Sequence, residues 1–282
     1  MIDFDDIETI VQRALDEDLP DITSDAIFGA DERARATFLV KGDGVLAGLR
    51  LARAVFATLD ASTRFTDLKK DGETVAPGEI VATVEASVRA LLSGERTALN
   101  LMQRASGIAT STRRYVEKVA GTRATVVDTR KTAPGLRALD KYAVTCGGGQ
   151  NHRIGLYDMF LIKNNHIDRA GSITKAVERV RAAGRREPLM VEVRNLEELD
   201  EVLLLSPDYI LLDNMSPEQL TESVRRTAGR IPLEASGGVT LETIAAVAAT
   251  GVDRISVGAI THSVRALDIS FRIDPPAMAS GL

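Results

Sequence analysis

The amino-acid sequence predicts an α/β protein in which a small α+β domain precedes a parallel (β/α) barrel. Two patterns indicate this fold class. Short β-type runs separated by Gly and Pro turns occupy residues 34–87, and β-type runs alternate with amphipathic helical runs beyond residue 120. The chain has 282 residues and is 44% hydrophobic. A chain of this length and hydrophobic content can form one large or two ordinary domains whose hydrophobic cores need no stabilising disulfide or bound metal.

The first part of the chain predicts helices around short strands. Helices are expected over residues 3–16, near residues 49–59 and over residues 88–120, from apolar residues at helical spacing. The Ser-Gly pair at positions 106–107 is a weak point in the last of these helices. We therefore place the domain boundary there, with the α+β domain over residues 1–106 and the barrel over residues 107–265.

The barrel is predicted from regular alternation. Six β-type runs cover residues 124–129, 158–166, 189–193, 209–214, 231–238 and 253–260. Amphipathic runs lie between them at residues 173–184, 196–205, 216–229 and 241–251, and most of these end at or near Gly. Such alternation requires a parallel sheet, either a barrel or a doubly wound sheet. A barrel brings the polar residues that end each strand to one mouth, whereas an open sheet spreads them along a line, so we favour the barrel.

The composition excludes several classes of protein. The acidic N-terminal stretch lacks a basic region leading into an apolar one, and no uninterrupted apolar run reaches about 18 residues. We expect neither secretion nor membrane insertion, and hence a cytoplasmic protein. The single cysteine, Cys146, excludes an intrachain disulfide and a multi-cysteine zinc site, and without an evident base it is expected to be inert.

Positive charge is concentrated in one segment. The net charge of −5 argues against general nucleic-acid binding, but the stretch from Arg96 to Lys163 holds 12 Lys or Arg and 4 Asp or Glu, a local charge of +8. A basic stretch is often a solvated helix face. Here the cations lie among loop-forming Gly, Pro, Thr and His residues, which favours a pocket for a small anion.

Two glycine turns indicate where a phosphate group could bind. Gly237 and Gly238 follow a β-type run and open a helical one, so backbone N–H groups could approach an anion. Gly258 stands at the corresponding place after the next run. Turns on consecutive late strands are typical of phosphate-binding barrels, although Gly is often only a turn residue. No GxxxxGK[ST] motif is present and no GxGxxG follows a strand, which argues against a nucleoside triphosphatase or a dinucleotide oxidoreductase.

Charged residues end several of the other strands. Glu192 and Asp213 could bind Mg²⁺ together with substrate phosphate oxygens, or could be ordinary surface carboxylates paired with Arg. Cations lie at strand ends or in adjacent loops, at Arg130, Lys131, Arg153 and Lys163. Four cations at one mouth repel one another unless a multiply charged anion lies among them.

His152, and one of the four cations, Lys163, allow alternative interpretations. His152 stands beside Arg153 and could donate to the same ligand, or could be a structural histidine. Lys163 ends an apolar strand, and it could instead be the Schiff-base nucleophile of a class I aldolase.

Five motifs between about residues 90 and 265 are informative together: GERTALNLMQRASGIAT, DTRKTAPGLRALDKYAVTCGGGQNHRIGLYDMFLIKNNHI, ILLDN, LEASGGVT and VGAITHSV. DTRKT followed by PG and then by GGGxNHR is a highly specific combination. These motifs closely resemble those of the quinolinate phosphoribosyltransferases, the type II phosphoribosyltransferases that act as decarboxylating nicotinate-nucleotide pyrophosphorylases in NAD biosynthesis. The resemblance implies an open α/β sandwich domain, an incomplete (β/α) barrel, and a chain end, residues 266–282, that returns to the first domain.

The resemblance also implies roles for individual residues. The quinolinate pocket would be lined by Thr129, Arg130, His152, Arg153 and Lys163, with Arg96 reaching it from the partner subunit of a homodimer or larger assembly. Lys131 would lie between quinolinate and phosphoribosyl pyrophosphate. The 5-phosphate would be held by Ser236, Gly237, Gly238, Val257, Gly258, Ala259 and His262. Glu192 and Asp213 would hold the ribose hydroxyls and Mg²⁺ bound through phosphoribosyl pyrophosphate. The catalytic set would be Lys131, Lys163, Glu192 and Asp213.

The implied reaction suits a cationic mouth, because quinolinate carries two carboxylates and phosphoribosyl pyrophosphate carries several charges. Transfer with decarboxylation would give nicotinate mononucleotide, pyrophosphate and CO₂. One departure is Asn164, where many family members carry Asp or Glu, and this removes a possible metal or ribose contact. Alternatives are nicotinate phosphoribosyltransferase, the relative associated with molybdate transport, a class I aldolase, and a phosphate-ligand sensor without turnover.

Overall fold

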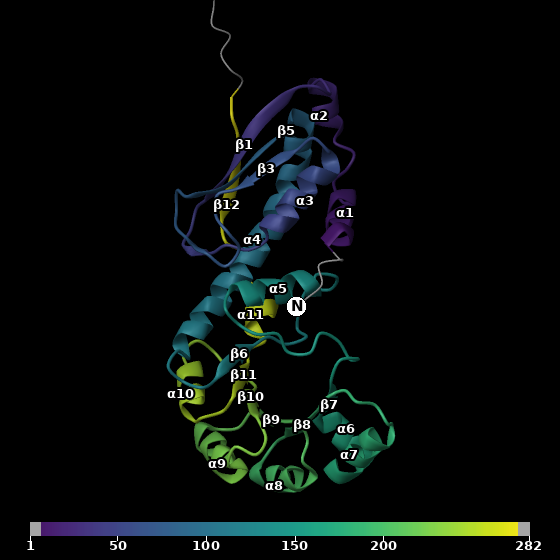
Figure 1. Cartoon of the computed structure of the whole chain (residues 1–282), viewed down its shortest axis with the longest axis vertical. Coiled ribbons are helices and arrows are strands. Elements are labelled where there is room, and N and C mark those ends of the chain that lie inside the picture. The colour runs from purple at the N-terminus through teal and green to yellow at the C-terminus, as the bar shows by residue number, and fades with distance from the viewer. Residues whose placement is uncertain (1–6, 276–282) are drawn as a thin grey trace, which may run out of the picture. The chain divides into compact units, whose positions relative to one another are not determined.

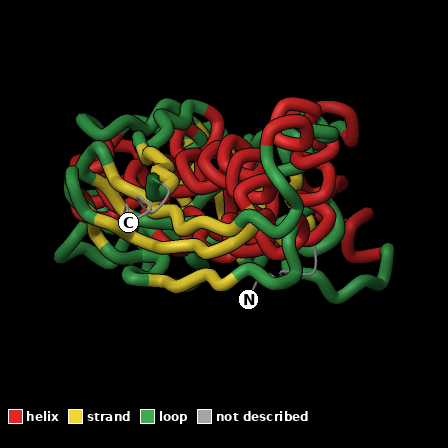
Figure 2. Tube along the Cα trace, turned by 90° about the horizontal axis from the view of Figure 1, so that it is seen from above, coloured by secondary structure: helices red, strands yellow, loops and turns green. Residues whose placement is uncertain are grey.

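The computed structural model describes residues 7–275 and divides them into two compact units, each of which combines helices with strands (Figures 1 and 2). The first unit contains the described residues up to Ser111, the segment Ala133–Gly148 and the described chain from Ser263 onward. The second contains Thr112–Thr132 and Gly149–His262. Residues 3–6 of the predicted first helix lie outside the described range.

The first unit is built around a four-stranded antiparallel sheet in the order β12-β1-β5-β3. Its strands are β1 (Arg33–Val40), β3 (Arg64–Asp67), β5 (Ile80–Ser87) and β12 (Ile269–Ile273). β2 (Gly44–Val45) and β4 (Thr74–Val75) form a separate short ladder. In the pairing of β1 with β12, Phe38 stands opposite Phe271. The chain end therefore completes this sheet, as the resemblance implied.

Aromatic side chains hold helix α3 (Leu49–Leu59) against the sheet. Phe56 of α3 stacks on Phe271 with ring centroids 5.5 Å apart, and Phe271 meets Phe38 edge-on at 4.9 Å. Phe38 and Phe56 are completely buried. Such pairs add roughly 0.5–1.5 kcal/mol to the free energy that burial of the rings contributes. Helix α1 (Ile7–Asp16) lies beside α3 and buries Val11 and Leu15.

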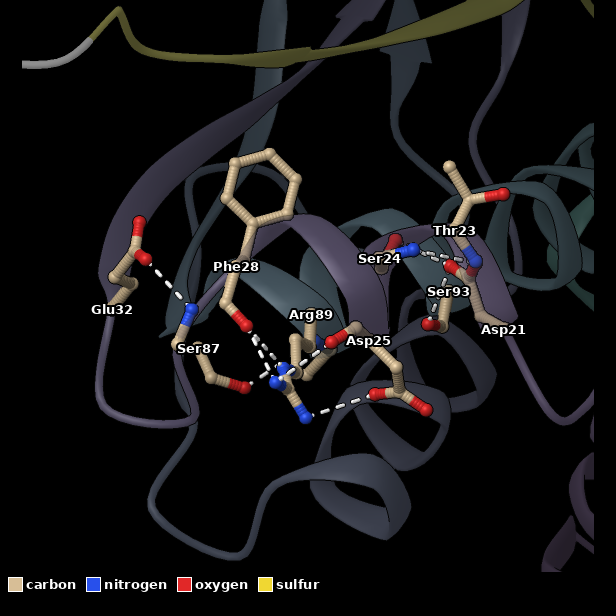
Figure 3. Close-up of polar contacts among 11 residues, drawn as sticks. Asp21, Thr23, Ser24, Asp25, Phe28, Glu32, Ser87, Arg89 and Ser93 are labelled. Atoms are coloured by element: carbon tan, nitrogen blue, oxygen red, sulfur yellow. Dashed lines mark hydrogen bonds and ion pairs between the residues drawn. The ribbon is translucent and has the colours of Figure 1, made fainter.

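Polar contacts fix the short helix α2 (Ile22–Ile27), which the sequence analysis did not predict (Figure 3). The carboxylate of Asp21 caps this helix by accepting hydrogen bonds from the backbone N–H groups of Thr23 and Ser24. The same carboxylate accepts a hydrogen bond from Ser93 at 3.0 Å. Arg89 donates to the carbonyl oxygen of Phe28. Because Ser93 and Arg89 belong to the long helix α4 (Val88–Lys118), these bonds tie α2 to α4.

Helix α4 runs without interruption through Ser106 and Gly107, so the predicted weak point is not a break. The Ser106 hydroxyl donates to the carbonyl oxygen of Ala47 and accepts from its N–H group. A Cβ atom on Gly107 would lie 2.3 Å from the carbonyl oxygen of Arg265. Both small residues therefore serve close backbone packing inside the first unit. The division between the units falls further along the helix, after Ser111.

A second unpredicted helix, α5 (Arg137–Cys146), also belongs to the first unit. Asp140 of α5 is completely buried and accepts two hydrogen bonds from Arg104 of α4, each 2.8 Å long. It also accepts from the N–H group of Ala133. Burial first, and then the charge of Asp71, raise the pKa of the Cys146 thiol to about 12, although a hydrogen bond with Tyr142 opposes this. A thiol with this pKa is unreactive, which agrees with the prediction for Cys146.

The second unit contains a six-stranded, all-parallel sheet in the order β6-β11-β10-β9-β8-β7. The strands are β6 (Thr125–Val127), β7 (Phe160–Ile162), β8 (Leu189–Val193), β9 (Tyr209–Asp213), β10 (Leu233–Ser236) and β11 (Arg254–Ser256). The helices are α6 (Asn164–Ala170), α7 (Ile173–Ala182), α8 (Leu196–Leu205), α9 (Pro217–Thr227), α10 (Ile244–Ala249) and α11 (Ala259–His262). Neighbours follow the chain order cyclically from β7 to β11 and then β6, which is barrel winding and excludes a doubly wound sheet.

The barrel is incomplete. No ladder joins β6 to β7 among the residues that the structure describes, and an isolated parallel bridge pairs Val127 with Gln150 beside β6. All six predicted strands and the four predicted helices between them are thus present, and the fold class is confirmed. The β-type run predicted over residues 158–166 is too long at its end, because residues 164–166 begin the unpredicted helix α6. No helix within residues 7–275 combines the length and apolarity that a membrane span requires.

Gly107→Ala tests the close packing inside α4. Replacing Gly by Ala in an open helix raises the free energy of unfolding by about 1 kcal/mol. Here the added Cβ meets a backbone carbonyl, so we expect this free energy to fall by about 1–3 kcal/mol in urea titration. Glu117→Ala, an exposed change in the same helix, is the control. A Gly107→Ala protein as stable as the unmodified chain would contradict the packing role.

Candidate active site

A cavity of about 740 Å³ opens in the second unit at the carboxyl ends of the parallel strands. Most of the predicted site residues line it: Thr129, Arg130, Lys131, His152, Arg153, Lys163, Glu192, Asp213, Ser236, Gly237, Gly238, Gly258, Ala259 and His262. Val257 is buried directly before Gly258 and is not among the lining residues. Arg96 lies on α4 in the first unit. The structure thus brings together the residues of one chain that the motifs singled out.

The sequence analysis missed several lining residues, namely Leu161, Leu211, Asn214, Glu234, Val239, Thr240 and Ser256. Glu234 could have been found from the period-two pattern of its strand. Side chains two apart in a strand share a face, so Glu234 had to lie on the same side as Ser236. The apolar Leu161 and Leu211 follow the same rule relative to Lys163 and Asp213.

Four cations surround the cavity, and the surroundings of one of them lower its pKa. Arg130, Lys131 and Lys163 are exposed, whereas Arg153 is half-buried. Burial lowers the pKa of the Arg153 guanidinium, and the positive charge of Arg130 lowers it further, against the opposing effect of Asp158. The two guanidinium groups therefore repel each other, which makes the cavity an attractive place for an anion with more than one charge.

Hydrogen bonds fix the chain on both sides of Arg153. The guanidinium donates through Nη1 to the carbonyl oxygen of Met159 at 3.2 Å. The carboxylate of Asp158 accepts from the N–H groups of Ile154 and Gly155, at 2.7 and 3.0 Å. These bonds close a tight turn after Arg153 and hold the side chain at the cavity wall.

His152 is buried and has both ring nitrogens directed at protein groups. Its backbone N–H donates to Asp128 at 2.8 Å. Its Nδ1 accepts from the N–H group of Arg153 at 2.7 Å, and its Nε2 lies 3.3 Å from Oε1 of Glu234. His152 could therefore donate to a ligand, as predicted, only if one ring nitrogen first leaves its partner, which is the N–H group of Arg153 or the carboxylate of Glu234.

The two predicted metal-binding carboxylates lie at the ends of neighbouring strands. Glu192 is buried, and its Oε2 lies 3.6 Å from Nζ of Lys163. Its Oε1 accepts from the N–H group of Asn164 at 3.3 Å. Asp213 is half-buried, and its Oδ2 accepts from the side-chain amide of Asn214 at 3.0 Å. Lys163 is half-exposed and paired with Glu192, whereas a Schiff-base lysine is activated by an apolar pocket or a neighbouring cation.

This donor set suits a magnesium ion that arrives with its ligand. Within residues 7–275, no group of three or more His, Cys, Asp or Glu side chains is arranged to hold a metal ion by itself. Mg²⁺ is usually bound by one or two carboxylates together with phosphate oxygens and water. Glu192 and Asp213 could supply the carboxylates at the cavity rim.

A glycine turn after β10 brings the backbone close to Asn214. Gly237 has φ +100°, and a Cβ atom there would lie 2.1 Å from Oδ1 of Asn214, so only glycine fits. Helix α10 begins at Ile244, three residues after the start of the predicted helical run at residue 241. Gly237, Gly238, Val239 and Thr240 line the cavity before this helix, and successive backbone N–H groups in such a turn can bind anions. Gly258, by contrast, directly precedes α11, as predicted.

The chain matches two protein-family descriptions, one for each part. Residues 21–106 match "Quinolinate phosphoribosyl transferase, N-terminal domain" and residues 108–272 match "Quinolinate phosphoribosyl transferase, C-terminal domain".

Known proteins with similar sequences and structures cover nearly the whole chain. Nicotinate-nucleotide pyrophosphorylase [carboxylating] of Mycobacterium leprae is 46% identical over 95% of this chain and 97% of the relative. The probable enzyme of the same name from Bacillus subtilis is 44% identical over 90% of this chain and 88% of the relative. The crystal structure of NadC from Streptococcus pyogenes superimposes with a TM-score of 0.92 at 40% identity, over 95% of this chain and 96% of that one. The chain therefore belongs to the quinolinate phosphoribosyltransferase family.

Proposed function

We propose that this protein transfers the phosphoribosyl group of phosphoribosyl pyrophosphate to quinolinate with loss of CO₂, giving nicotinate mononucleotide and pyrophosphate for NAD biosynthesis. One observation carries the proposal. In a member of this family, a single cavity combines four cations, the carboxylates of Glu192 and Asp213, and two glycine turns at the ends of parallel strands. This set of groups matches a pair of polyanionic substrates that must lie side by side.

The cations would bind the acceptor. Quinolinate carries two carboxylates, and Arg130, Arg153 and Lys163 would hold them. Arg can bind a carboxylate with two parallel hydrogen bonds, whereas Lys acts as a point charge. Lys131 would lie between the acceptor and the phosphoribosyl donor. The repulsion between Arg130 and Arg153 would disappear once a dianion lies between them.

The glycine turns and the carboxylates would bind the donor. The backbone around Gly237, Gly238 and Gly258, with Ser236 and His262, would hold the 5-phosphate. Glu192 and Asp213 would hold the ribose hydroxyls. They would also bind Mg²⁺ together with pyrophosphate oxygens, and this ion would supply positive charge to the departing pyrophosphate.

The protein would act mainly by positioning and by charge. As the bond from the ribose C1 to the pyrophosphate oxygen breaks, positive charge develops on the ribose, and the lone pair of the quinolinate nitrogen forms the new bond to C1. The quaternised ring then accepts the electron pair of the adjacent ring-carboxylate bond, and CO₂ leaves. A proton from solvent completes the ring carbon. Lys131 and Lys163 would stabilise the negative charges in the cavity throughout.

Arg96 would complete the site from a second subunit. It lies in the first unit, outside the set of residues that line the cavity. We propose a homodimer or a larger assembly in which Arg96 of one chain binds a quinolinate carboxylate held in its partner.

Turnover of the purified protein tests the proposed function. With phosphoribosyl pyrophosphate and Mg²⁺, quinolinate is expected to release pyrophosphate and CO₂ in equal amounts. Nicotinate should react poorly, because its single carboxylate leaves part of the cationic wall without a partner. Pyrophosphate release with nicotinate but not with quinolinate would instead identify a nicotinate phosphoribosyltransferase. Pyrophosphate without CO₂ would contradict the decarboxylation.

Arg153→Ala tests the acceptor side of the cavity. Loss of a buried charge partner removes about 2–5 kcal/mol of binding free energy, so KM for quinolinate should rise at least about thirtyfold. KM for phosphoribosyl pyrophosphate should change little. Arg186→Ala, an exposed arginine outside the cavity, is the matched control. An equal rise of both KM values would contradict the assignment of Arg153 to quinolinate.

Mixing two variants, each assayed at a quinolinate concentration near the KM of the unmodified protein where both are nearly silent, tests the shared site. If Arg96 acts in the partner, Arg96→Ala on one chain and Arg153→Ala on the other fall in the same site of a mixed dimer, so its other site stays intact. After exchange of subunits at equal concentrations, activity should recover to about a quarter of the unmodified level. Verified subunit exchange with no recovery would mean that both arginines act within one chain, whereas an Arg96→Ala protein with unmodified activity before mixing would mean that Arg96 has no role.

A further inference from the structure

A group of buried polar side chains lies at the floor of the cavity. Glu234 of β10 is completely buried, and its Oε1 accepts a hydrogen bond from the hydroxyl of Ser256. The same oxygen lies 3.3 Å from Nε2 of His152, whose side chain is only 7% exposed. Nε of Arg254 lies 3.7 Å from Oε2 of Glu234, and this oxygen has no hydrogen-bond partner. The carboxylate thus meets groups from β11 and from the segment before Arg153.

The hydrogen bonds of His152 determine which ring nitrogen carries its proton. Nδ1 accepts the N–H group of Arg153 at 2.7 Å, so Nδ1 has no proton of its own. In a neutral imidazole the proton must then lie on Nε2, which faces the Glu234 carboxylate. A proton on Nδ1 would point at the Arg153 N–H group and break this bond. Glu234 therefore stabilises the one neutral form of His152 that can hold the backbone of Arg153.

Glu234 is suited to this task because further polar groups face its buried carboxylate. The hydroxyl of Ser256 donates to Oε1, and Nε of Arg254 lies 3.7 Å from Oε2. A carboxylate accepts hydrogen bonds about twice as strongly as a neutral group. In metal sites, partners that orient a histidine in this way typically change affinity or activity 10–100-fold when they are lost.

We infer that Glu234 is a positioning residue of the acceptor site: through His152 it fixes the backbone of Arg153 and hence the direction from which this guanidinium meets the acceptor. The assignment rests on the proposed function only in naming quinolinate as that acceptor. Glu234 itself touches no reacting atom in this role. Its effect reaches the substrate through two successive contacts, 3.3 Å from Glu234 to Nε2 of His152 and 2.7 Å from Nδ1 of His152 to the N–H group of Arg153.

The link from Glu234 to His152 can be measured without any substrate. The chain has 3 histidines, so imidazole nitrogen resonances of protein labelled with ¹⁵N-histidine can be assigned by single substitution. At pH 8 the unmodified protein should show His152 with its proton on Nε2. In Glu234→Gln, which keeps the size of the side chain and removes its charge, the proton should be distributed over both nitrogens. A proton on Nδ1 in the unmodified protein would overturn the inference, whether or not any variant folds.

Kinetics then test the consequence for Arg153. In Glu234→Gln, KM for quinolinate should rise about tenfold, while KM for phosphoribosyl pyrophosphate stays within about twofold. A purely structural defect lowers the active fraction, which reduces kcat and leaves both KM values unchanged. Glu201→Gln is the matched control, since Glu201 accepts hydrogen bonds from Thr174 in the same unit and does not line the cavity.

The two measurements separate this inference from the proposed function. If the unmodified protein does not use quinolinate, the proposed function fails, and the nitrogen resonances still test the contact between Glu234 and His152. If it does use quinolinate and Glu234→Gln changes neither the position of the His152 proton nor KM, the positioning role is refuted. A KM for quinolinate that rises equally in Glu201→Gln would also refute it.

Discussion

Repulsion among like charges is the constraint that shapes the barrel end of this protein. Four cations surround one cavity, and burial first, and then the charge of Arg130, lower the pKa of Arg153. Without an anion, such groups favour conformations in which they move apart. The surrounding structure prevents this for Arg153, because the turn closed by Asp158 and the contact with His152 hold it in place. The cavity is therefore organised for anion binding before any ligand arrives.

The order of elements was predictable from the sequence because alternation and periodicity are local. All six barrel strands and the long helix α4 lie where the pattern placed them. Helices α2 and α5 were not predicted, since both depend on side chains distant in the sequence. Asp140 of α5 is held by Arg104, and Asp21 before α2 is held by Ser93. The Ser106 and Gly107 pair was misread as a helix break because its close backbone neighbours come from elsewhere in the chain.

The residues of the candidate site that stand at strand ends were predictable from the sequence. Barrel winding brings such ends together, so charged residues after apolar runs indicated the cavity without knowledge of any contact. Glu234 was missed because its importance comes from the pairing with His152, which is 82 residues away along the chain. The helix after Gly237 and Gly238 was predicted from residue 241 and begins at Ile244, since a glycine pair does not show how many residues separate a turn from the next helix.

Strand β12 has a consequence for the order in which the protein is made. β1 lies between β5 and β12, and its pairing with Ile269–Ile273 completes the sheet of the first unit (Figure 1). A growing chain on the ribosome cannot finish this sheet until residues 269–273 have been translated. The second unit, whose residues end at His262, is available earlier. Although domains generally mature from the N-terminus during synthesis, here the sheet that starts first is the last to be completed.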